Sequence, residues 1–109
     1  MGRPMKVFAA CDENGNTKVR VLIRHDMETG RRKEKDGSLV PAHFIKHVRV
    51  QHKQKTVLSA QWGTAVSKNP SLFCYFRGGS AGDEVSVSWV DNLGENNSKS
   101  TIVTKASNG

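Results

Sequence analysis

Histidines are the residues of this chain best suited to bind a metal or move a proton, and there are four of them: His25, His43, His47 and His52. None has a cysteine or carboxylate at a spacing that defines a metal site. His25 and His43 stand at the two ends of one long connection and could meet in space. Two histidines without further ligands make a weak site. We therefore expect surface or capping histidines and no bound metal.

Other chemistry has little to start from. The chain contains no phosphate-binding Gly-Lys-Ser/Thr ending and no dinucleotide glycine fingerprint. The glycine-rich stretch 78–82 lies between two expected strands rather than before a helix, which is typical of a flexible hairpin turn. The sequence therefore predicts a protein that is not an enzyme, with no catalytic residue and no cofactor.

Two cysteines, Cys11 and Cys74, are too few for a disulfide scaffold or a four-ligand metal site. Cysteines at a strand end and in a core strand can approach within bridging distance when their strands share or face a sheet. An oxidising compartment would allow such a bridge, and a reducing one would leave both thiols free. If unpaired, Cys74 is expected to be an inert core residue because aromatic residues surround it in the sequence.

Positive charge is the clearest compositional signal. Seventeen Lys and Arg against ten Asp and Glu give a net charge of +7, which attracts acidic partners without choosing among them. Only Arg31-Arg32-Lys33 forms an uninterrupted basic run, and the scattered remainder indicates a solvated face. Nucleic-acid binding would also need exposed aromatic residues. The aromatic residues mostly occupy apolar runs or core-facing positions, so we expect no stacking platform.

The elements that must position these residues are strands. Val19, Val21 and Ile23 alternate with charged residues, as do Val48 and Val50, which is the two-residue period of half-buried strands. Between them, residues 25–45 form the longest stretch without alternation. A connection of this length usually serves a purpose in a compact domain. We expect a tight turn at Asp36-Gly37 and a short helical turn beginning at Pro41.

Seven short strands are expected in all. They cover residues 4–10, 17–25, 46–52, 56–62 and 72–76, a sixth around 84–89, and a seventh that contains Ile102. The apolar run 72–76 is expected to be buried on both faces. Regular turns between short strands favour an all-β, two-sheet sandwich, and the length fits one domain over residues 1–109. No apolar run is long enough to cross a bilayer, and the N-terminus lacks the apolar core of a secretory signal, which taken alone suggests the cytoplasm.

The chain closely resembles the SoxZ family, the small subunit of the SoxYZ sulfur-carrier complex of bacterial thiosulfate oxidation. The resemblance covers about residues 17–105. It is carried by His25, Met27-Glu28, Gly30, Arg32-Lys33, Asp36-Gly37, Leu39-Val40-Pro41, Asn69-Pro70, Phe73 to Phe76, Ala81-Gly82, Trp89 and Asp91.

This resemblance implies an immunoglobulin-like, seven-stranded antiparallel β-sandwich that pairs with SoxY, whose C-terminal arm ends in a glycine-flanked, sulfur-carrying cysteine. The present sequence ends in Lys-Ala-Ser-Asn-Gly, so we do not expect it to be the carrier subunit. It would present the SoxY arm to the other Sox enzymes, with no catalytic residue of its own. The resemblance also implies a periplasmic location, reached by export together with SoxY.

Candidate partner-contacting residues follow from exposure and charge. Leu22, Phe73 and Tyr75 are apolar residues that a lone sandwich would expose, although they could instead belong to a second core face. Arg31 and Arg32 could dock an acidic surface or guide an anionic substrate. Expressed alone, the domain is expected to self-associate. The second hypothesis for its function is a basic nucleic-acid-binding sandwich, and a histidine metalloenzyme is a distant third.

Overall fold

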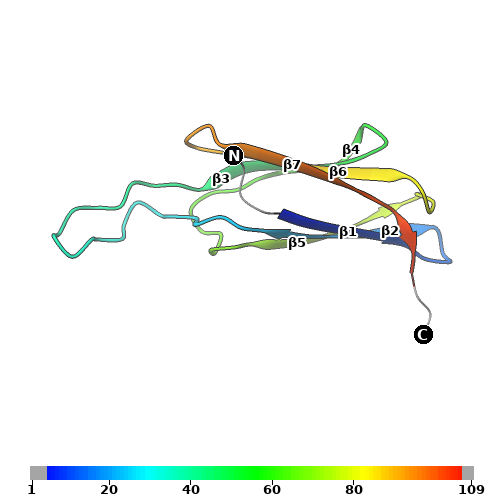
Figure 1. The fold of residues 1–109 in the computed structure, drawn as a ribbon, viewed down its shortest axis with the longest axis horizontal. Coiled ribbons are helices and arrows are strands. Elements are labelled where there is room, and N and C mark those ends of the chain that lie inside the picture. The colour runs from blue at the N-terminus through cyan, green and yellow to red at the C-terminus, as the bar shows by residue number, and fades with distance from the viewer. Residues whose placement is uncertain (1–4, 107–109) are drawn as a thin grey trace.

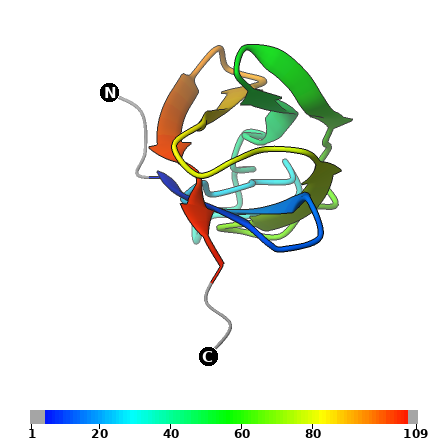
Figure 2. The same cartoon turned by 90° about the vertical axis from the view of Figure 1, so that its right-hand side faces the viewer.

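Two four-stranded sheets face each other in the computed structural model, which describes residues 5–106. The strands are β1 (Met5–Cys11), β2 (Asn16–Ile23), β3 (Ile45–His52), β4 (Lys55–Gln61), β5 (Ser71–Arg77), β6 (Glu84–Asp91), β7 (Asn96–Ile102) and β8 (Thr104–Lys105). One sheet has the order β5-β2-β1-β8 and the other the order β4-β3-β6-β7. Figure 1 shows the two layers from the side, and Figure 2 shows them stacked from the end.

The core lies between the sheets and is built from the alternating valines and isoleucines. Val19 and Val21 in β2, Val50 in β3 and Val87 in β6 are all completely buried. Full burial of such a side chain stabilises the fold by roughly 1.5–3 kcal/mol. The two-residue period therefore identified the inward faces of these strands correctly.

The immunoglobulin-like β-sandwich is confirmed, with two differences in detail. An eighth strand, β8, pairs with β1 in parallel, through Ala10 with Thr104 and Cys11 with Lys105. The expectation of seven strands and wholly antiparallel pairing is thus wrong at this edge, because two residues are too few to show any period. Within residues 5–106 there are no helices, and so none that could span a bilayer.

The outward face of β5 corrects a second expectation. Residues 72–76 do not form a strand buried on both faces, because Phe73 and Tyr75 are 52% and 68% exposed. Only the alternate residues Leu72, Cys74 and Phe76 pack against the core. When both faces of a strand carry apolar residues, the alternation of side chains does not indicate which face an aromatic residue occupies.

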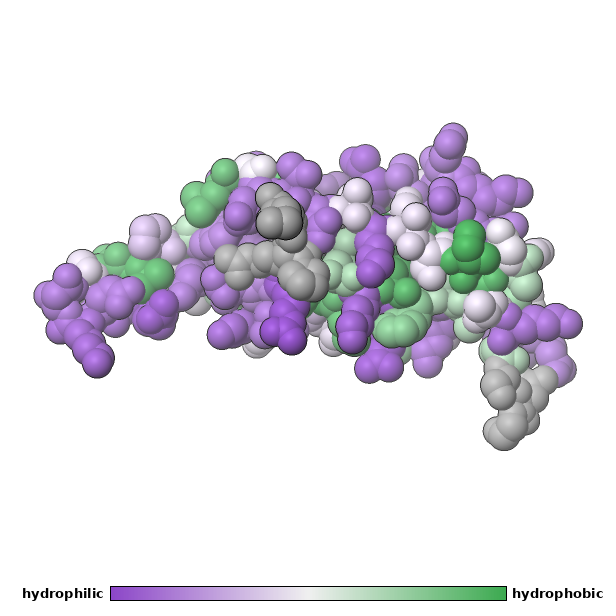
Figure 3. Space-filling view, viewed as in Figure 1, coloured by the Kyte–Doolittle hydropathy of each residue, from purple (hydrophilic) through white to green (hydrophobic). Residues whose placement is uncertain are grey.

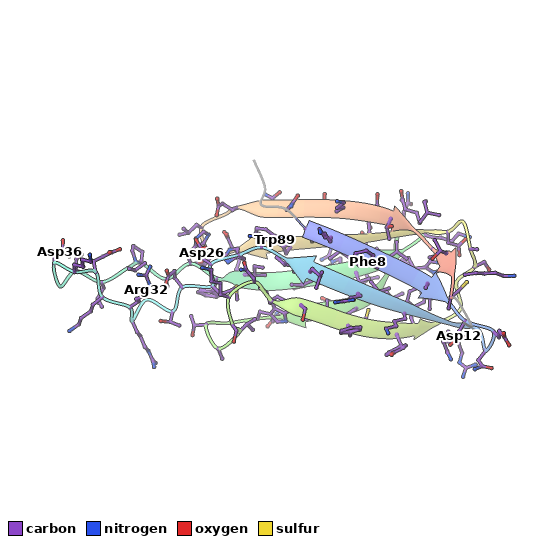
Figure 4. All side chains as sticks on the ribbon, turned by 60° about the horizontal axis from the view of Figure 1, so that its bottom comes forward. Phe8, Asp12, Asp26, Arg32, Asp36 and Trp89 are labelled. Atoms are coloured by element: carbon purple, nitrogen blue, oxygen red, sulfur yellow. The ribbon has the colours of Figure 1, made fainter. Side chains whose placement is uncertain are left out.

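The connection between β2 and β3, residues 24–44, projects from one end of the sandwich, and we call it the arm (Figure 1). It helps to give the molecule a length of 56 Å against a width of 29 Å. Opposite sides of the arm pair through Glu28 with His43 and Lys33 with Leu39. Asp36 lies at its tip, where the expected turn is confirmed by the positive φ of Gly37 (Figure 4).

The surface of the arm is mostly hydrophilic, with a small apolar patch (Figure 3). Leu39 is 58% exposed there. The helical turn expected from Pro41 does not form, because this side of the arm is extended and pairs with the opposite side. The arm is therefore a long, irregular hairpin.

Candidate functional site

Two histidines and two carboxylates converge at the base of the arm. His25 and His43 come from the two ends of the arm, and Asp91 and Glu95 come from the end of β6 and the turn after it. The Nε2 atom of His43 lies 2.6 Å from Asp91 Oδ2 and 2.7 Å from Glu95 Oε2, and His25 Nε2 lies 3.0 Å from the same Asp91 oxygen. The expectation of a surface or capping histidine is wrong for His25, which is completely buried.

Asp91 is the centre of this cluster. Its Oδ1 accepts hydrogen bonds from the backbone N–H groups of Leu93 and Glu95, at 3.0 and 2.9 Å, which closes the turn between β6 and β7. That leaves Oδ2 for the two histidines. Burial alone would raise the pKa of Asp91, but the hydrogen bonds from His25 and His43, and from the backbone, lower it from 3.8 to about 2. The carboxylate is therefore ionised at neutral pH although it is buried.

The tautomer of His25 is fixed by the other side of its ring. The backbone N–H of Met27 donates to His25 Nδ1 at 3.0 Å, so that nitrogen must carry its lone pair. The ring proton then resides on Nε2 and is donated to Asp91. Met27 adopts a φ of 51°, a left-handed conformation in this turn. The geometry makes His25 a hydrogen-bond donor rather than a free base.

Two asparagines attach the ends of the arm to the sandwich. Asn69 Oδ1 accepts from the N–H of His25 at 3.0 Å. Asn92 accepts from the N–H of Phe44 at 2.8 Å and donates its amide to the carbonyl of Ala42 at 2.9 Å. The base of the arm, where the cluster lies, is therefore hydrogen-bonded to the sandwich at both ends of the arm.

Trp89, from β6, packs against His25 of the cluster. Its ring packs edge-on against His25 at a centroid distance of 5.3 Å. Its indole Nε1 is buried and has no hydrogen-bond acceptor among residues 5–106. His25 is therefore in contact with both a buried apolar ring and an ionised carboxylate.

A second candidate site is the outer face of β5, β2 and β1. Phe8, 51% exposed, lies beside Arg20, which lies beside Phe73 in the next strand. The side-chain cations of Lys18 and Arg20 stand 5.1 and 5.7 Å from the centre of the Phe73 ring. Tyr75 lies on the same face. We call this surface the aromatic face.

The aromatic face corrects the expectation that no stacking platform exists. It bears two shallow hollows of about 320 Å³ each. One borders Phe8 and Arg20, and the other borders Leu22 and Arg24 near the base of the arm. Leu22 is half-buried, in contrast to the open Phe73 and Tyr75.

Arg31 and Arg32 lie elsewhere, on the arm (Figure 4 labels Arg32). Arg32 forms a close ion pair with Glu28, with Nη2 at 2.6 Å from Oε2. Arg31 is exposed, and its backbone N–H donates to the hydroxyl oxygen of Thr29 at 3.1 Å. The predicted contact residues therefore fall into two groups, one on the sandwich and one on the arm.

The cysteines are unbridged. Cys11 is in β1 and Cys74 in β5, with β2 between them, and neighbouring strands are about 4.8 Å apart, so their separation exceeds the reach of a disulfide. Burial raises the pKa of the Cys74 thiol, which agrees with an inert thiol.

Residues 78–82 read Gly-Gly-Ser-Ala-Gly, which has the spacing of a nucleophile elbow. They form the turn between β5 and β6, no helix follows, and the Ser80 N–H donates to Asp83. The hydrogen-bond partners of His47 and His52 are Ser59 and Asp83, each at 2.8 Å. His47 thus lies beside a hydroxyl on an exposed strand surface, whereas His52 pairs with a carboxylate, so the two histidines do not combine into the serine, histidine and carboxylate chain of a triad.

Comparison with known proteins gives one family and one fold. The model of the family described as sulphur oxidation protein SoxZ matches residues 5–102. Among solved structures, the chain is similar to a mutant superoxide reductase (neelaredoxin) from Archaeoglobus fulgidus in the reduced form, with a TM-score of 0.60 and 12% identity over 95% of this chain and 91% of that one. Identity this low shows a shared fold alone. No curated protein matches the chain significantly.

Proposed function

Because the chain belongs to the SoxZ family, we propose that it is the non-catalytic subunit that pairs with SoxY in the carrier complex of thiosulfate oxidation. In this role it holds SoxY and presents the cysteine arm of SoxY to the other Sox enzymes. The proposal rests on one observation above the family match: three aromatic rings, Phe8, Phe73 and Tyr75, stand exposed together on one sheet face.

The aromatic face has the composition of a partner surface. Aromatic and arginine residues contribute most of the binding energy at typical interfaces, and Arg20 stands between Phe8 and Phe73. Two hollows on the same face can receive side chains of a partner. The basic residues Lys6, Lys18 and Arg20 at their edges favour a partner surface with acidic residues around an apolar centre.

The arm supplies a second contact region for transient partners. It carries Arg31 and Lys33 on exposed positions away from the sandwich. We assign to it the docking of acidic surfaces on Sox enzymes, or the guidance of an anionic sulfur compound toward the SoxY cysteine. A periplasmic location, reached by export together with SoxY, belongs to the same proposal, since pairing before export would cover the exposed aromatic rings.

Substitution of the aromatic face tests the pairing. Phe73→Asp and Tyr75→Asp are each co-expressed with SoxY, and the amount of SoxY that co-purifies is measured. Both substitutions should reduce it strongly, because an uncompensated carboxylate would be buried in the interface. Ile102→Asp is the matched control, since Ile102 is a similarly exposed strand residue of the other sheet. Undiminished co-purification of both variants would remove this face from the interface.

A nucleic-acid-binding sandwich is the second candidate, and the cations beside the exposed Phe73 ring favour it. The two hypotheses separate in a single titration. Fluorescence anisotropy with a labelled single-stranded oligonucleotide should show no binding at physiological salt if the face serves SoxY. Tight, steeply salt-dependent binding that Phe73→Asp abolishes would favour the nucleic-acid function instead.

A further inference from the structure

The cluster at the base of the arm has fewer protons than its short contacts require. His43 Nε2 lies 2.6 Å from one carboxylate oxygen and 2.7 Å from another. An imidazole nitrogen carries at most one proton, so it cannot donate a good hydrogen bond to both oxygens at once. Asp91 Oδ2 already receives the proton of His25. One imidazole nitrogen and two carboxylate oxygens therefore face a common point that a single proton satisfies poorly.

We propose that His43, Asp91 and Glu95 bind a divalent metal ion of the zinc class at the base of the arm. The ion takes the position of the Nε2 proton of His43, the ring proton then lies on Nδ1, and the ion is shared by all three side chains. This site goes beyond the pairing with SoxY and does not depend on it.

His25 is a positioning residue in this site rather than a ligand. Its Nδ1 accepts from the Met27 N–H, and its Nε2 proton points at Asp91 Oδ2. Metal ligands are commonly held by such hydrogen bonds from outside the coordination shell. The backbone N–H groups of Leu93 and Glu95 hold the other oxygen of Asp91 in the same way. Asp91, the ligand with the least freedom, is thus oriented by hydrogen bonds to both of its carboxylate oxygens.

The electrostatics suit a dication. Two carboxyl groups beside an imidazole nitrogen form an electronegative site, whose charge a bound Zn²⁺ would offset. An imidazole nitrogen with carboxylate oxygens is a donor set that zinc accepts, whereas magnesium and calcium prefer oxygen ligands alone. His43 binds the ion through an Nε2 that carries no proton, so the affinity for Zn²⁺ should fall as the pH falls.

The geometry allows entry with small movements. In a tetrahedral zinc site with bonds of about 2.0 Å, neighbouring ligand atoms are about 3.3 Å apart. The contacts of His43 with Asp91 and Glu95 would therefore open by roughly 0.6 to 0.7 Å. Glu95 can provide this movement because its side chain is 49% exposed, and that same exposure gives the ion a path from solvent. A water molecule would complete the coordination.

Metal titration of the full chain without SoxY tests the proposal. The protein is treated with chelator, and Zn²⁺ binding is followed by calorimetry at neutral and at mildly acidic pH. We expect saturation at one equivalent, weaker binding at the lower pH, and a higher Tm at about 100 µM Zn²⁺. Co²⁺ should give visible absorption without a thiolate charge-transfer band, since neither cysteine belongs to the site.

Glu95→Gln is the informative variant, because Glu95 is partly exposed and its side chain can change without disturbing the core. It should weaken Zn²⁺ binding by at least about tenfold. The control is His52→Gln, which removes a different histidine and carboxylate pair and should bind as the unchanged chain does. Absence of saturable binding at about 100 µM Zn²⁺, or equal affinity of Glu95→Gln and the unchanged chain, would overturn the site.

Discussion

At the scale of single residues, Asp91 shows how one carboxylate organises two separate parts of the fold. Its two oxygens divide their work, with Oδ1 closing the turn between β6 and β7 and Oδ2 accepting from His25 and His43. An unpaired buried charge would cost several kcal/mol. Here four donors compensate that cost, so the charged form is favoured over the neutral one.

Asp91→Asn should therefore change how stability depends on pH. The pKa of Asp91 is lowered in the folded state, to about 2 from an ordinary value of 3.8. Its ionised form therefore contributes stability above about pH 4, and that contribution is lost as the pH falls through about 2. In urea unfolding at several pH values, the unchanged chain should lose more stability across this window than Asp91→Asn does. At neutral pH the variant should be less stable by several kcal/mol.

The matched control for this comparison is Asp12→Asn. Asp12 also accepts backbone hydrogen bonds, but in an exposed turn and without a histidine partner. An amide oxygen can accept the same bonds, so the stability of this variant should follow that of the unchanged chain. Parallel acid titrations of Asp91→Asn and the unchanged chain would contradict the assigned role of the carboxylate.

At the scale of elements, alternation of side chains predicts the strands well. It says little about which residues of different elements come into contact. β2, β3 and β6 follow the period directly, because each has one inward face of valines or isoleucines. In the cluster, His25 and His43 are 66 and 48 positions away from Asp91 in the sequence. No local spacing reveals such a pair. It depends on which strands become neighbours, and that is decided by the topology of the whole sandwich.

The arm should lose order when Asn92 is shortened to alanine. This substitution removes the side-chain hydrogen bonds to Phe44 and Ala42 at one end of the arm, at a cost of about 1–3 kcal/mol. Hydrogen exchange measured by mass spectrometry should become faster in residues 26–43 and stay unchanged in β1. Asn96→Ala is the control, because the Asn96 side chain makes only a 3.4 Å contact with the carbonyl of Gly94. Uniformly faster exchange through both sheets would mean that Asn92 stabilises the sandwich rather than the arm.

At the scale of the molecule, an exposed aromatic face and a net charge of +7 act in opposite directions on the isolated chain. The apolar rings favour association of two copies, and the charge opposes it. Salt screens the repulsion without weakening apolar contacts. Light scattering should therefore show self-association that rises with protein concentration and with salt, and Tyr75→Asp should reduce it. A monomer at every salt and protein concentration would contradict the interpretation that the aromatic face drives self-association.

The arm and the aromatic face should also affect different rate constants of partner binding. Charged residues far from a buried interface mainly change the association rate, whereas buried anchors mainly change the dissociation rate. Arg31→Glu with Lys33→Glu is the better pair for testing the arm, because replacing Arg32 would also leave Glu28 without its ion-pair partner. In surface plasmon resonance, this double variant paired with SoxY should associate more slowly with an acidic Sox enzyme. The salt dependence of its association rate should also be weaker. Lys55→Glu, on an exposed position of β4, is the control and should change neither quantity. If the salt dependence of the double variant were unaltered, the charge of the arm would lie outside the approach path of the partner. The arm would then have no role in steering.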